Sequence, residues 1–183
     1  MIVMLNGSFA VGKTTAAELL VERLYHSMLY DPEVVGAGLA HIVRPIEGFS
    51  DFQDLTAWRE LVIETARVLK RIYGRTLVVP MTLWHRPYFE EIVAGLRGLD
   101  PHLYHFCLTA RKETLHKRLA QRQHEHTEQA LTWIRERMER CLAAFEAPAF
   151  ALQIPTDERT PSEIVELILT AIEQESGLIG AGR

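Results

Sequence analysis

The sequence of 183 residues predicts a single three-layer α/β domain built on a five-stranded parallel sheet. Strand-like and helix-like segments alternate along the chain, and this alternation is typical of right-handed β–α–β crossovers. The segment Thr76–Met81 is almost continuously apolar, as expected for a parallel strand covered by helices on both faces. Because the chain length suits one core, we expect one domain over residues 1–176 and a flexible tail over residues 177–183.

Short apolar segments are expected to form the sheet. They are Ile2–Leu5, Ser27–Pro32, Thr76–Met81, His102–Thr109 and Phe150–Pro155. Helices are expected between and after them, over residues 14–26, Ser50–Tyr73, Lys112–Arg122, Thr132–Phe145 and from Thr160 onward. Ser50 with Gln53, and Thr160 with Glu163, have the spacing of a capping box, in which side chains satisfy free N–H groups at a helix start.

Composition and charge argue against several classes of protein. The net charge of −4 disfavours nucleic acid as a partner, since binding to a phosphate backbone needs clustered positive charge. No apolar run approaches the roughly 18 residues of a membrane-spanning helix, so we expect at most a peripheral membrane contact. Cys107 and Cys141 lack the spacing of a metal site, and we expect them to be buried free thiols in a cytoplasmic protein.

The chain opens with a phosphate-binding motif. Gly7, Gly12, Lys13 and Thr14 fit the pattern G-x-x-x-x-G-K-[ST], between an expected strand and an expected helix. Glycine allows backbone angles with which successive N–H groups point at one anion, and the helix start adds its own free N–H groups. The whole loop is therefore expected to contact a nucleotide. Its residues are Gly7, Ser8, Phe9, Ala10, Val11, Gly12, Lys13, Thr14 and Thr15.

The same motif predicts two cofactors, ATP and Mg²⁺. Lys13 is expected to act as a catalytic cation at the β- and γ-phosphates, and the Thr14 hydroxyl is expected to bind the metal. The Asn-Lys-x-Asp motif with which regulatory GTPases read guanine is missing, because none of the four lysines is followed by x-Asp. An ATP user with a separate pocket for a small-molecule acceptor, as in nucleoside monophosphate kinases and shikimate kinases, fits the sequence better.

Asp31 ends the second expected strand, at the edge of the sheet where open α/β folds bind ligands. Its carboxylate could accept the proton of a substrate hydroxyl, orient that hydroxyl, or hold Mg²⁺ through water. Alternatively, Asp31 is only a turn residue before Pro32. The third strand ends in Pro80, Met81 and Thr82 where many P-loop proteins carry a metal-binding Asp. This difference leaves Thr14 and Thr82 on the Mg²⁺ side and raises the importance of Asp31, and Thr82 is also a candidate for the substrate site.

Arginines are the remaining candidates for the acceptor pocket and a lid. Arg118 and Arg122 lie four residues apart on one helical face, beside a short lid expected near residues 123–129. There they would neutralise charge on a transferring phosphoryl group, although an ordinary solvated helix face is the alternative. Arg59 and Arg86 interrupt apolar surroundings and could bind substrate. Two roles are open for the nearby aromatic residues, which could form a wall of the same pocket or pack in the core: Trp58, Trp84, Tyr88 and Phe89.

With these motifs assembled, the chain resembles the bacterial tunicamycin-resistance family of P-loop ATP-binding proteins. The resemblance runs through MLNGSFAVGKTTAAELL, LYDPEVVG, VVPMTLWHRPYFEEI and TARKETLHKRLAQR. The Tyr-Asp-Pro-Glu end of the second strand and the Val-Pro-Met-Thr end of the third are its most specific parts. It implies a nucleoside-kinase-like P-loop fold, ATP binding and protection against tunicamycin, an antibiotic built from uracil, amino sugars and a fatty chain.

The resemblance leaves three functions open. The first is an ATP-dependent phosphotransferase that acts on a hydroxyl of the nucleoside antibiotic or of a related small molecule. The second is a protein that binds and sequesters the drug, which the missing acid after the third strand favours. The third is a housekeeping kinase for a small metabolite. For a fatty chain, Pro32–Val43 is a candidate wall of an apolar groove.

Overall fold

The computed structural model describes residues 1–122, 124, 127–146 and 152–180. It contains a five-stranded parallel sheet in the order β2-β3-β1-β4-β5, so that β1 lies at the centre between β3 and β4. The strands are β1 Ile2–Gly7, β2 Ser27–Leu29, β3 Thr76–Pro80, β4 Leu103–Thr109 and β5 Leu152–Pro155. The α/β fold expected from the sequence is confirmed, and each expected strand is present with its ends shifted by a few residues.

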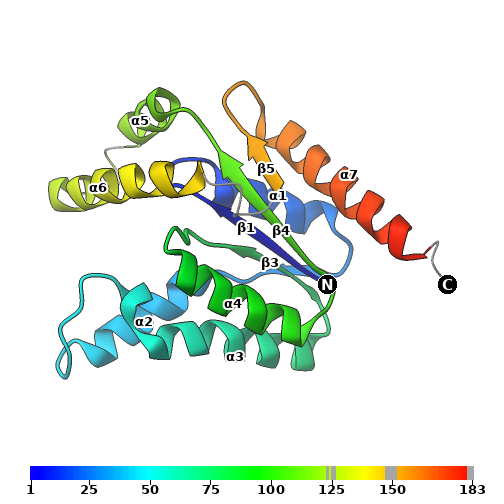
Figure 1. Cartoon of the computed structure of the whole chain (residues 1–183), viewed down its shortest axis with the longest axis horizontal. Coiled ribbons are helices and arrows are strands. Elements are labelled where there is room, and N and C mark those ends of the chain that lie inside the picture. Colours follow the sequence, from blue (N-terminus) through cyan, green and yellow to red (C-terminus); the bar gives the residue numbers. More distant parts are fainter. Residues whose placement is uncertain (123, 125–126, 147–151, 181–183) are drawn as a thin grey trace.

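Helices cover both faces of the sheet (Figure 1). They are α1 Lys13–Arg23, α2 Pro32–Val43, α3 Thr56–Tyr73, α4 Arg86–Leu99, α5 Lys112–Gln121, α6 Glu128–Phe145 and α7 Pro161–Gly180, with a 3₁₀ helix η1 Phe52–Asp54 before α3. Helices α1 and α7 pack together on one face, and α3 and α4 pack together on the other. Helices α5 and α6 follow β4 and lie at the carboxyl end of the sheet.

The side chains of β1 divide between two apolar cores. Ile2 and Met4 pack with the α3 and α4 residues of one core, whereas Val3 and Leu5 pack with those of α1 and α7 in the other. All four side chains are fully buried, because alternate residues of a strand point to opposite faces and helices cover both. The central strand is thereby fixed in register, and with it the position where the P-loop begins.

Helix α6 belongs to both cores. Ile134 and Met138 pack with the α1 and α7 side, and Cys141 and Phe145, further along the same helix, pack with the α3 and α4 side. A helix that reaches both faces must cross the end of the sheet, and here it crosses the end at which the P-loop lies. Both cysteines are buried and free, and burial raises the pKa of each thiol to about 12.

The helix expected over Ser50–Tyr73 is shorter than the sequence suggests. The α-helix begins at Thr56, and the capping residue of the preceding 3₁₀ turn is Asp51, whose Oδ1 accepts from the N–H of Gln53 at 3.1 Å. The expected capping box fails because its Gln53 side chain is used elsewhere: Nε2 donates to the carbonyl oxygen of Thr82 at 2.9 Å. A tertiary hydrogen bond therefore overrides the local capping signal.

Helix α2 occupies the segment that the sequence suggests as a groove wall. Asp31 caps it and Pro32 sits in its first turn, a combination that starts a helix as well as a turn. Gly36 lies against the ring of Phe52, where a Cβ atom would come within 2.6 Å, and Leu39 packs against the core. The apolar residues of α2 line none of the four best-formed cavities of the described residues, and a groove along this helix stays a prediction.

The ends of the last two helices also differ from expectation. Helix α6 begins at Glu128, with the Thr127 hydroxyl accepting from the N–H of Ala130 at 3.2 Å, so that only part of the expected lid at 123–129 precedes it. Residues 123, 125 and 126 of that lid lie outside the described residues, as do residues 181–183 of the expected tail; α7 continues to Gly180. Within the described part of the chain, no helix has the length and apolar character needed to cross a membrane.

The stability of this fold should decrease between pH 6.5 and 4 through His105. Its ring lies 4.8 Å from that of Phe89, and its buried Nε2 has no hydrogen-bond partner among the described residues. Burial, and secondarily the charge of Arg97, lowers the pKa of His105 to about 4. Between these pH values the unfolded chain binds a proton that the folded chain does not. The free energy of unfolding therefore decreases as the pH decreases, by on the order of 3 kcal/mol at most.

Chemical denaturation of His105→Phe between pH 4 and 7 checks this expectation. The variant should show a shallower decrease in the free energy of unfolding than the wild type. His102→Gln, a change at an exposed histidine just before the same strand, serves as the control and should retain the wild-type slope. Equal slopes for His105→Phe and the wild type would contradict the expectation.

Candidate nucleotide and acceptor site

The turn at Gly7 fixes the start of the P-loop against β4. Gly7 has a φ of 151°, and a Cβ atom on it would lie 2.6 Å from the carbonyl oxygen of Leu108 and 2.9 Å from Cγ1 of Val11. The first of these atoms belongs to the backbone of the neighbouring strand and cannot move aside, so only glycine fits. The loop therefore leaves the sheet at a point that the pairing of β1 with β4 determines.

The rest of the P-loop leads into α1, and no side chain caps the N–H groups at the start of this helix. Ala10 and Gly12 have positive φ values of 59° and 102°, and Gly12 is the N-cap of α1. No side chain caps this helix, so the N–H groups of its first turn remain available. Free N–H groups together with the positive end of the helix dipole are suited to binding a phosphate.

Lys13 lies folded over the loop that precedes it. Its Nζ donates to the carbonyl oxygen of Ser8 at 2.8 Å and lies 5.9 Å from the centre of the Phe9 ring. Burial lowers the pKa of this ammonium group, while the charge of Glu33 acts in the opposite direction. The cation of the motif is thus held at the loop before any ligand binds.

Asn6, which the sequence motifs do not single out, ties the P-loop strand to the segment after β3. Its side chain is completely buried, with Nδ2 donating to the carbonyl oxygen of Leu83 at 2.9 Å. Its Oδ1 accepts from the N–H groups of Gly7 at 2.8 Å and Leu83 at 2.9 Å. One side chain therefore sets the distance between the nucleotide loop and the loop that carries Thr82.

A cleft of about 160 Å³ collects seven of the fifteen residues predicted for catalysis and binding. Lys13 and Thr14 reach it from the P-loop, Asp31 from the end of β2, Thr82 from the segment after β3 and Arg122 from the end of α5. These residues are far apart in the sequence and meet because the carboxyl ends of parallel strands lie at one edge of the sheet.

Glu33 also lines this cleft and is a candidate that the sequence motifs missed. Burial is the largest effect on its carboxyl group and raises its pKa, the Lys13 charge lowers it, and the nearby carboxylates of Asp31 and Asp51 raise it further. A carboxyl group with a raised pKa is suited to accepting a proton near neutral pH. Its place two residues after Asp31, at the end of a strand, is the signal that could have found it.

Asp31 is both a helix cap and a cleft residue, and its role in proton transfer or metal binding stays a prediction. Its Oδ1 accepts from the N–H of Glu33 at 2.9 Å and caps α2, and the residue also lines the cleft. The cap holds one carboxylate oxygen in place and, through the start of α2, fixes Glu33 beside it. Two carboxylates and the ammonium group of Lys13 thus line one small cleft.

The oxygen atoms around the cleft fit a magnesium ion bound partly by a nucleotide. Thr14, Asp31 and Glu33 supply a hydroxyl and two carboxylates, the hard ligands that Mg²⁺ prefers. No group of three or more His, Cys, Asp or Glu side chains forms a metal cage in the described chain. This set suits the usual mode of Mg²⁺, which takes one or two carboxylates and completes its shell with phosphate and water.

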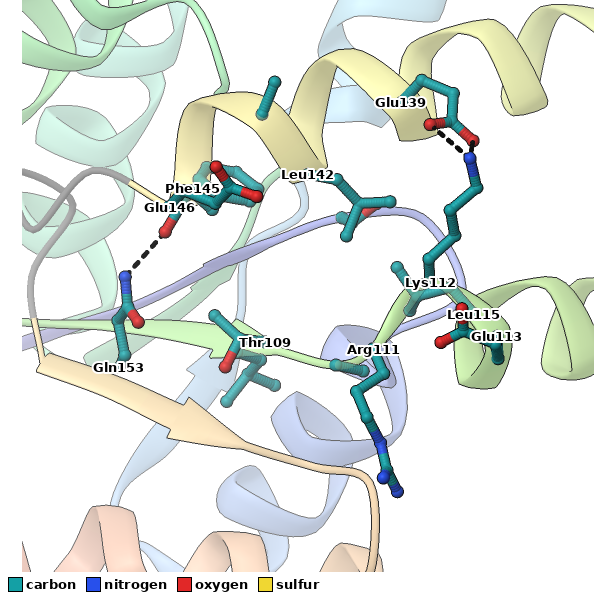
Figure 2. Close-up of a pocket in the computed structure, with 14 residues that line it drawn as sticks. Thr109, Arg111, Lys112, Glu113, Leu115, Glu139, Leu142, Phe145, Glu146 and Gln153 are labelled. Atoms are coloured by element: carbon teal, nitrogen blue, oxygen red, sulfur yellow. Dashed lines mark hydrogen bonds and ion pairs between the residues drawn. The ribbon is translucent and has the colours of Figure 1, made fainter.

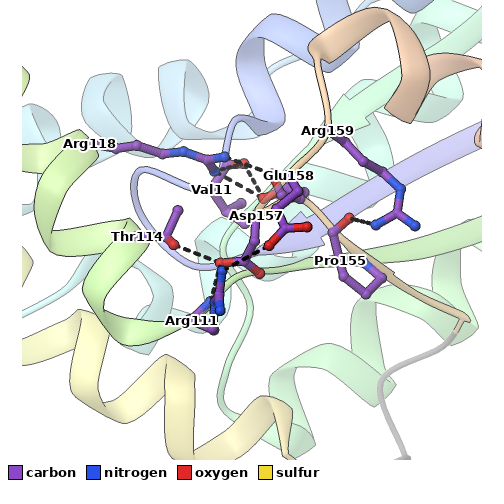
Figure 3. Close-up of polar contacts among 9 residues, drawn as sticks. Val11, Arg111, Thr114, Arg118, Pro155, Asp157, Glu158 and Arg159 are labelled. Atoms are coloured by element: carbon purple, nitrogen blue, oxygen red, sulfur yellow. Dashed lines mark hydrogen bonds and ion pairs between the residues drawn. The ribbon is translucent and has the colours of Figure 1, made fainter.

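Arg118 lies away from the cleft and links the P-loop to the segment after β5 (Figure 3). Its guanidinium donates to the carbonyl oxygen of Val11 at 3.2 Å, and to Oγ1 and the carbonyl oxygen of Thr156 at 2.9 and 2.8 Å. Beside it, Asp157 accepts from the Thr114 hydroxyl at 2.7 Å and from the N–H of Arg111 at 3.0 Å. Arg118 therefore supports the back of the P-loop, whereas Arg122 lines the cleft, and a catalytic role of either arginine stays a prediction.

Arg59 and Arg86 do not line the cleft. Arg59 is buried and pairs with Glu91 at 2.7 Å, and it also donates to the carbonyl oxygen of Gln53 at 2.8 Å. Arg86 is exposed and pairs with Glu90 one helical turn away. The structure thus uses Arg59 to hold the loop before α3, and a role of either arginine in substrate binding stays a prediction.

A cavity of about 580 Å³ lies beside Ser8, between α6 and the ends of β4 and β5 (Figure 2). Leu108, Leu115, Leu142 and Phe145 are among its apolar lining residues. At its rim Lys112 pairs with Glu139 at 2.8 Å. The cavity contains none of the residues that the motifs predict for catalysis.

A family model for an AAA domain matches residues 2–148, a range that holds the P-loop and every residue of the cleft. The chain belongs to the AAA domain family. Membership implies nucleotide binding, in agreement with the loop geometry described above. No curated protein sequence matches this AAA domain protein significantly.

Solved structures of kinases and of a resistance protein share its fold. A tunicamycin resistance protein from Deinococcus radiodurans superposes with a TM-score of 0.73 at 22% identity, over 94% of this chain and 95% of the other. A gluconokinase from Sinorhizobium meliloti 1021 gives a TM-score of 0.68 at 16% identity, over 99% and 97% of the chains. A shikimate kinase from Aquifex aeolicus vf5 gives 0.59 at 16% identity, over 96% and 98%. At these identities the likeness establishes a kinase-like P-loop fold.

Gly7→Ala should prevent nucleotide binding and destabilise the AAA domain. The added methyl group would meet the Leu108 carbonyl oxygen at 2.6 Å, and overpacking of this kind costs about 1–3 kcal/mol. Gly98→Ala, in α4 with open space around the new Cβ atom, is the control. Urea denaturation and titration with a fluorescent ATP analogue measure both effects, and normal ATP binding by Gly7→Ala would contradict the expectation.

Arg118→Gln should lower the free energy of unfolding by about 2 kcal/mol, because the shorter side chain cannot replace charge-assisted hydrogen bonds to both Val11 and Thr156. Lys117→Gln, at an exposed side chain of the same helix, is the comparison and should cost less stability. Urea denaturation of both variants measures the difference. Equal losses of stability would show that Arg118 has no special supporting role.

Proposed function

We propose that this protein is an ATP-dependent phosphotransferase that acts on a hydroxyl group of a small molecule. The observation that carries the proposal is the meeting of Lys13, Thr14, Asp31 and Glu33 around one cleft. The loop and Lys13 supply the cationic side, where a triphosphate belongs, and the carboxylates supply the opposite side, where an acceptor hydroxyl would lose its proton. The kinase-like fold supports the same reaction class.

Each group would contribute to the transfer of the γ-phosphoryl group in a different way. The bond between the γ-phosphorus and its bridging oxygen breaks and leaves ADP, while the acceptor oxygen forms a new bond to the phosphorus. The acceptor proton passes to Asp31 or Glu33, and Lys13 and Arg122 stabilise negative charge on the phosphoryl oxygens. Mg²⁺, bound near Thr14 and the carboxylates, would offset the charge of the phosphates.

Tunicamycin is the acceptor that we test first. The chain resembles the tunicamycin-resistance family in its P-loop, its Tyr-Asp-Pro-Glu segment and its Val-Pro-Met-Thr segment, and it shares its fold with the Deinococcus radiodurans resistance protein. The antibiotic carries sugar hydroxyls that a phosphotransferase can modify. Phosphorylation would add charge to the drug and thereby protect the cell.

A binding protein that sequesters the same drug is the second candidate. It is favoured by one observation: the end of β3 and the residues that follow read Pro80, Met81 and Thr82 and offer no carboxylate for a metal. In that case nucleotide binding would close the site on the drug, with little or no transfer. Protection would then be stoichiometric with the amount of protein.

Mass spectrometry of tunicamycin incubated with the protein, ATP and Mg²⁺ distinguishes the two candidates. A gain of one phosphate, absent with Lys13→Ala, is the expected result. Drug binding that requires ATP but yields no product would favour sequestration. Neither binding nor product would reject tunicamycin as the ligand, and phosphorylation of other small molecules, including simple metabolites, would then be screened.

The two carboxylates of the cleft should differ in their effect on turnover. Glu33→Gln should lower kcat about a hundredfold or more if Glu33 is the base, and the remaining activity should lose the rise with pH that a base of raised pKa imposes. Asp31→Asn should keep ATP binding and reduce turnover if Asp31 takes the proton. Rates from pH 5 to 9 with each variant assign the base, and unchanged turnover in either variant removes that residue from the mechanism.

A further inference from the structure

A second hollow, of about 120 Å³, lies beside the cleft. We call it the aromatic hollow; its lining includes Asp51, Asp54, Trp84, His85, Tyr88, Arg137 and Arg140. It adjoins the cleft through Gln53, which lines the hollow and donates to the carbonyl oxygen of Thr82, a cleft residue. A hollow of this size is smaller than the pocket of a whole ligand, so it would hold one group of a molecule that extends into the cleft.

The floor of the aromatic hollow is a buried ion pair. Nε of Arg137 donates to Oδ2 of Asp51 at 2.9 Å, and the two side chains are only 9% and 10% exposed. The other Asp51 oxygen caps η1, and the Arg137 guanidinium stacks on the Trp133 ring at 3.8 Å. The charges of this pair cancel within the protein, so the floor is rigid and attracts neither anions nor cations.

The rim offers hydrogen-bonding groups that the protein leaves available. Asp54 accepts only from the hydroxyl groups of Ser50, at 3.2 Å, and Tyr88, at 3.5 Å, and has no ion-pair partner among the described side chains. Arg140, across the hollow, lies 5.6 Å from the Trp84 ring and likewise forms no ion pair in the described chain. Nδ1 of His85 is buried and has no hydrogen-bond partner within the same residues.

Aromatic rings form the remaining wall. The His85 ring lies 4.1 Å from that of Tyr88 and 5.8 Å from that of Trp84, so the three form a continuous surface. Such a surface packs against the C–H face of a ring, while the carboxylate of Asp54 accepts from hydroxyl groups and the guanidinium of Arg140 donates to ring or hydroxyl oxygens.

We propose that the aromatic hollow binds a neutral polyhydroxylated ring, such as a hexose or an N-acetylated amino sugar, that forms part of the acceptor. The proposal rests on the proposed phosphotransfer, since it places this ring next to the carboxylates of the cleft. Neutrality follows from the sum of the lining charges: Asp51 pairs with Arg137, and Asp54 and Arg140, which form no ion pair in the described chain, bring one negative and one positive charge to the same hollow. An anionic sugar acid would meet the carboxylate of Asp54 as well as the guanidinium of Arg140, whereas a neutral ring can hydrogen-bond to both.

Calorimetric titration with N-acetylglucosamine and with glucuronate, each in the presence of Mg²⁺ and a non-hydrolysable ATP analogue, tests the proposal. The wild type should bind N-acetylglucosamine at least about tenfold more tightly than glucuronate. Arg140→Gln should weaken N-acetylglucosamine binding by about tenfold, the loss of one good hydrogen-bonding partner. Arg135→Gln, an exposed arginine of the same helix outside the hollow, is the control and should bind as the wild type.

A second variant tests the charge argument directly. Asp54→Asn removes the carboxylate that offsets Arg140, so it should reverse the preference and bind glucuronate more tightly than N-acetylglucosamine. Both Asp54 and Arg140 are exposed, and thermal unfolding checks that the variants fold. A wild type that prefers glucuronate, a wild type that binds neither sugar, or equal effects of Arg140→Gln and Arg135→Gln would each overturn the proposal.

These outcomes are separable from those of the proposed function, because they measure binding and not transfer. Sugar binding that depends on Arg140, together with no phosphorylated product from any acceptor, would keep the hollow and reject the phosphotransferase. A phosphorylated product together with no sugar binding would keep the phosphotransferase and reject the hollow.

Discussion

The close approach of Gly7 to the backbone of Leu108 is the constraint on which the rest of the site depends. It fixes where the central strand ends, and therefore where the loop that carries Lys13 begins. Asn6, one residue earlier, ties the same point to the segment after β3 through hydrogen bonds with Leu83. Because both contacts are buried, the spacing between the phosphate side and the acceptor side of the cleft is set by the sheet and by the fully buried side chain of Asn6, and not by exposed side chains.

Helix α6 links the regions around this sheet edge. It packs on the P-loop through the edge-to-face contact of Trp133 with Phe9, at 5.6 Å between ring centres, and it pairs with the loop before α3 through Arg137 and Asp51. It also forms one wall of the large cavity near Ser8. Helix α6 therefore contacts the nucleotide loop and the loop before α3 at once.

The surroundings of the cleft lower the pKa of Lys13 and raise that of Glu33, so that the two values lie closer together than in water. Burial disfavours the charged forms of both Lys13 and Glu33, and the attraction between them opposes that effect. Before a nucleotide binds, the carboxylate therefore helps to keep the lysine charged. A triphosphate near Lys13 would add negative charge to the cleft and favour proton uptake by Glu33, which is the direction that a general base requires.

The sequence by itself determined the elements whose signals are local. The glycines and lysine of the P-loop, the apolar strands and the Thr160 capping box specify backbone conformation within a few residues, and the fold and the nucleotide loop followed from them. The tertiary structure alone decided where the remaining polar side chains lie. Arg118 hydrogen-bonds to the P-loop backbone, and Glu33 lines the cleft. The side chain of Gln53 hydrogen-bonds to Thr82 and does not form the expected capping box, because contacts across the fold outweigh local preference. No local pattern contains the positions of those distant partners.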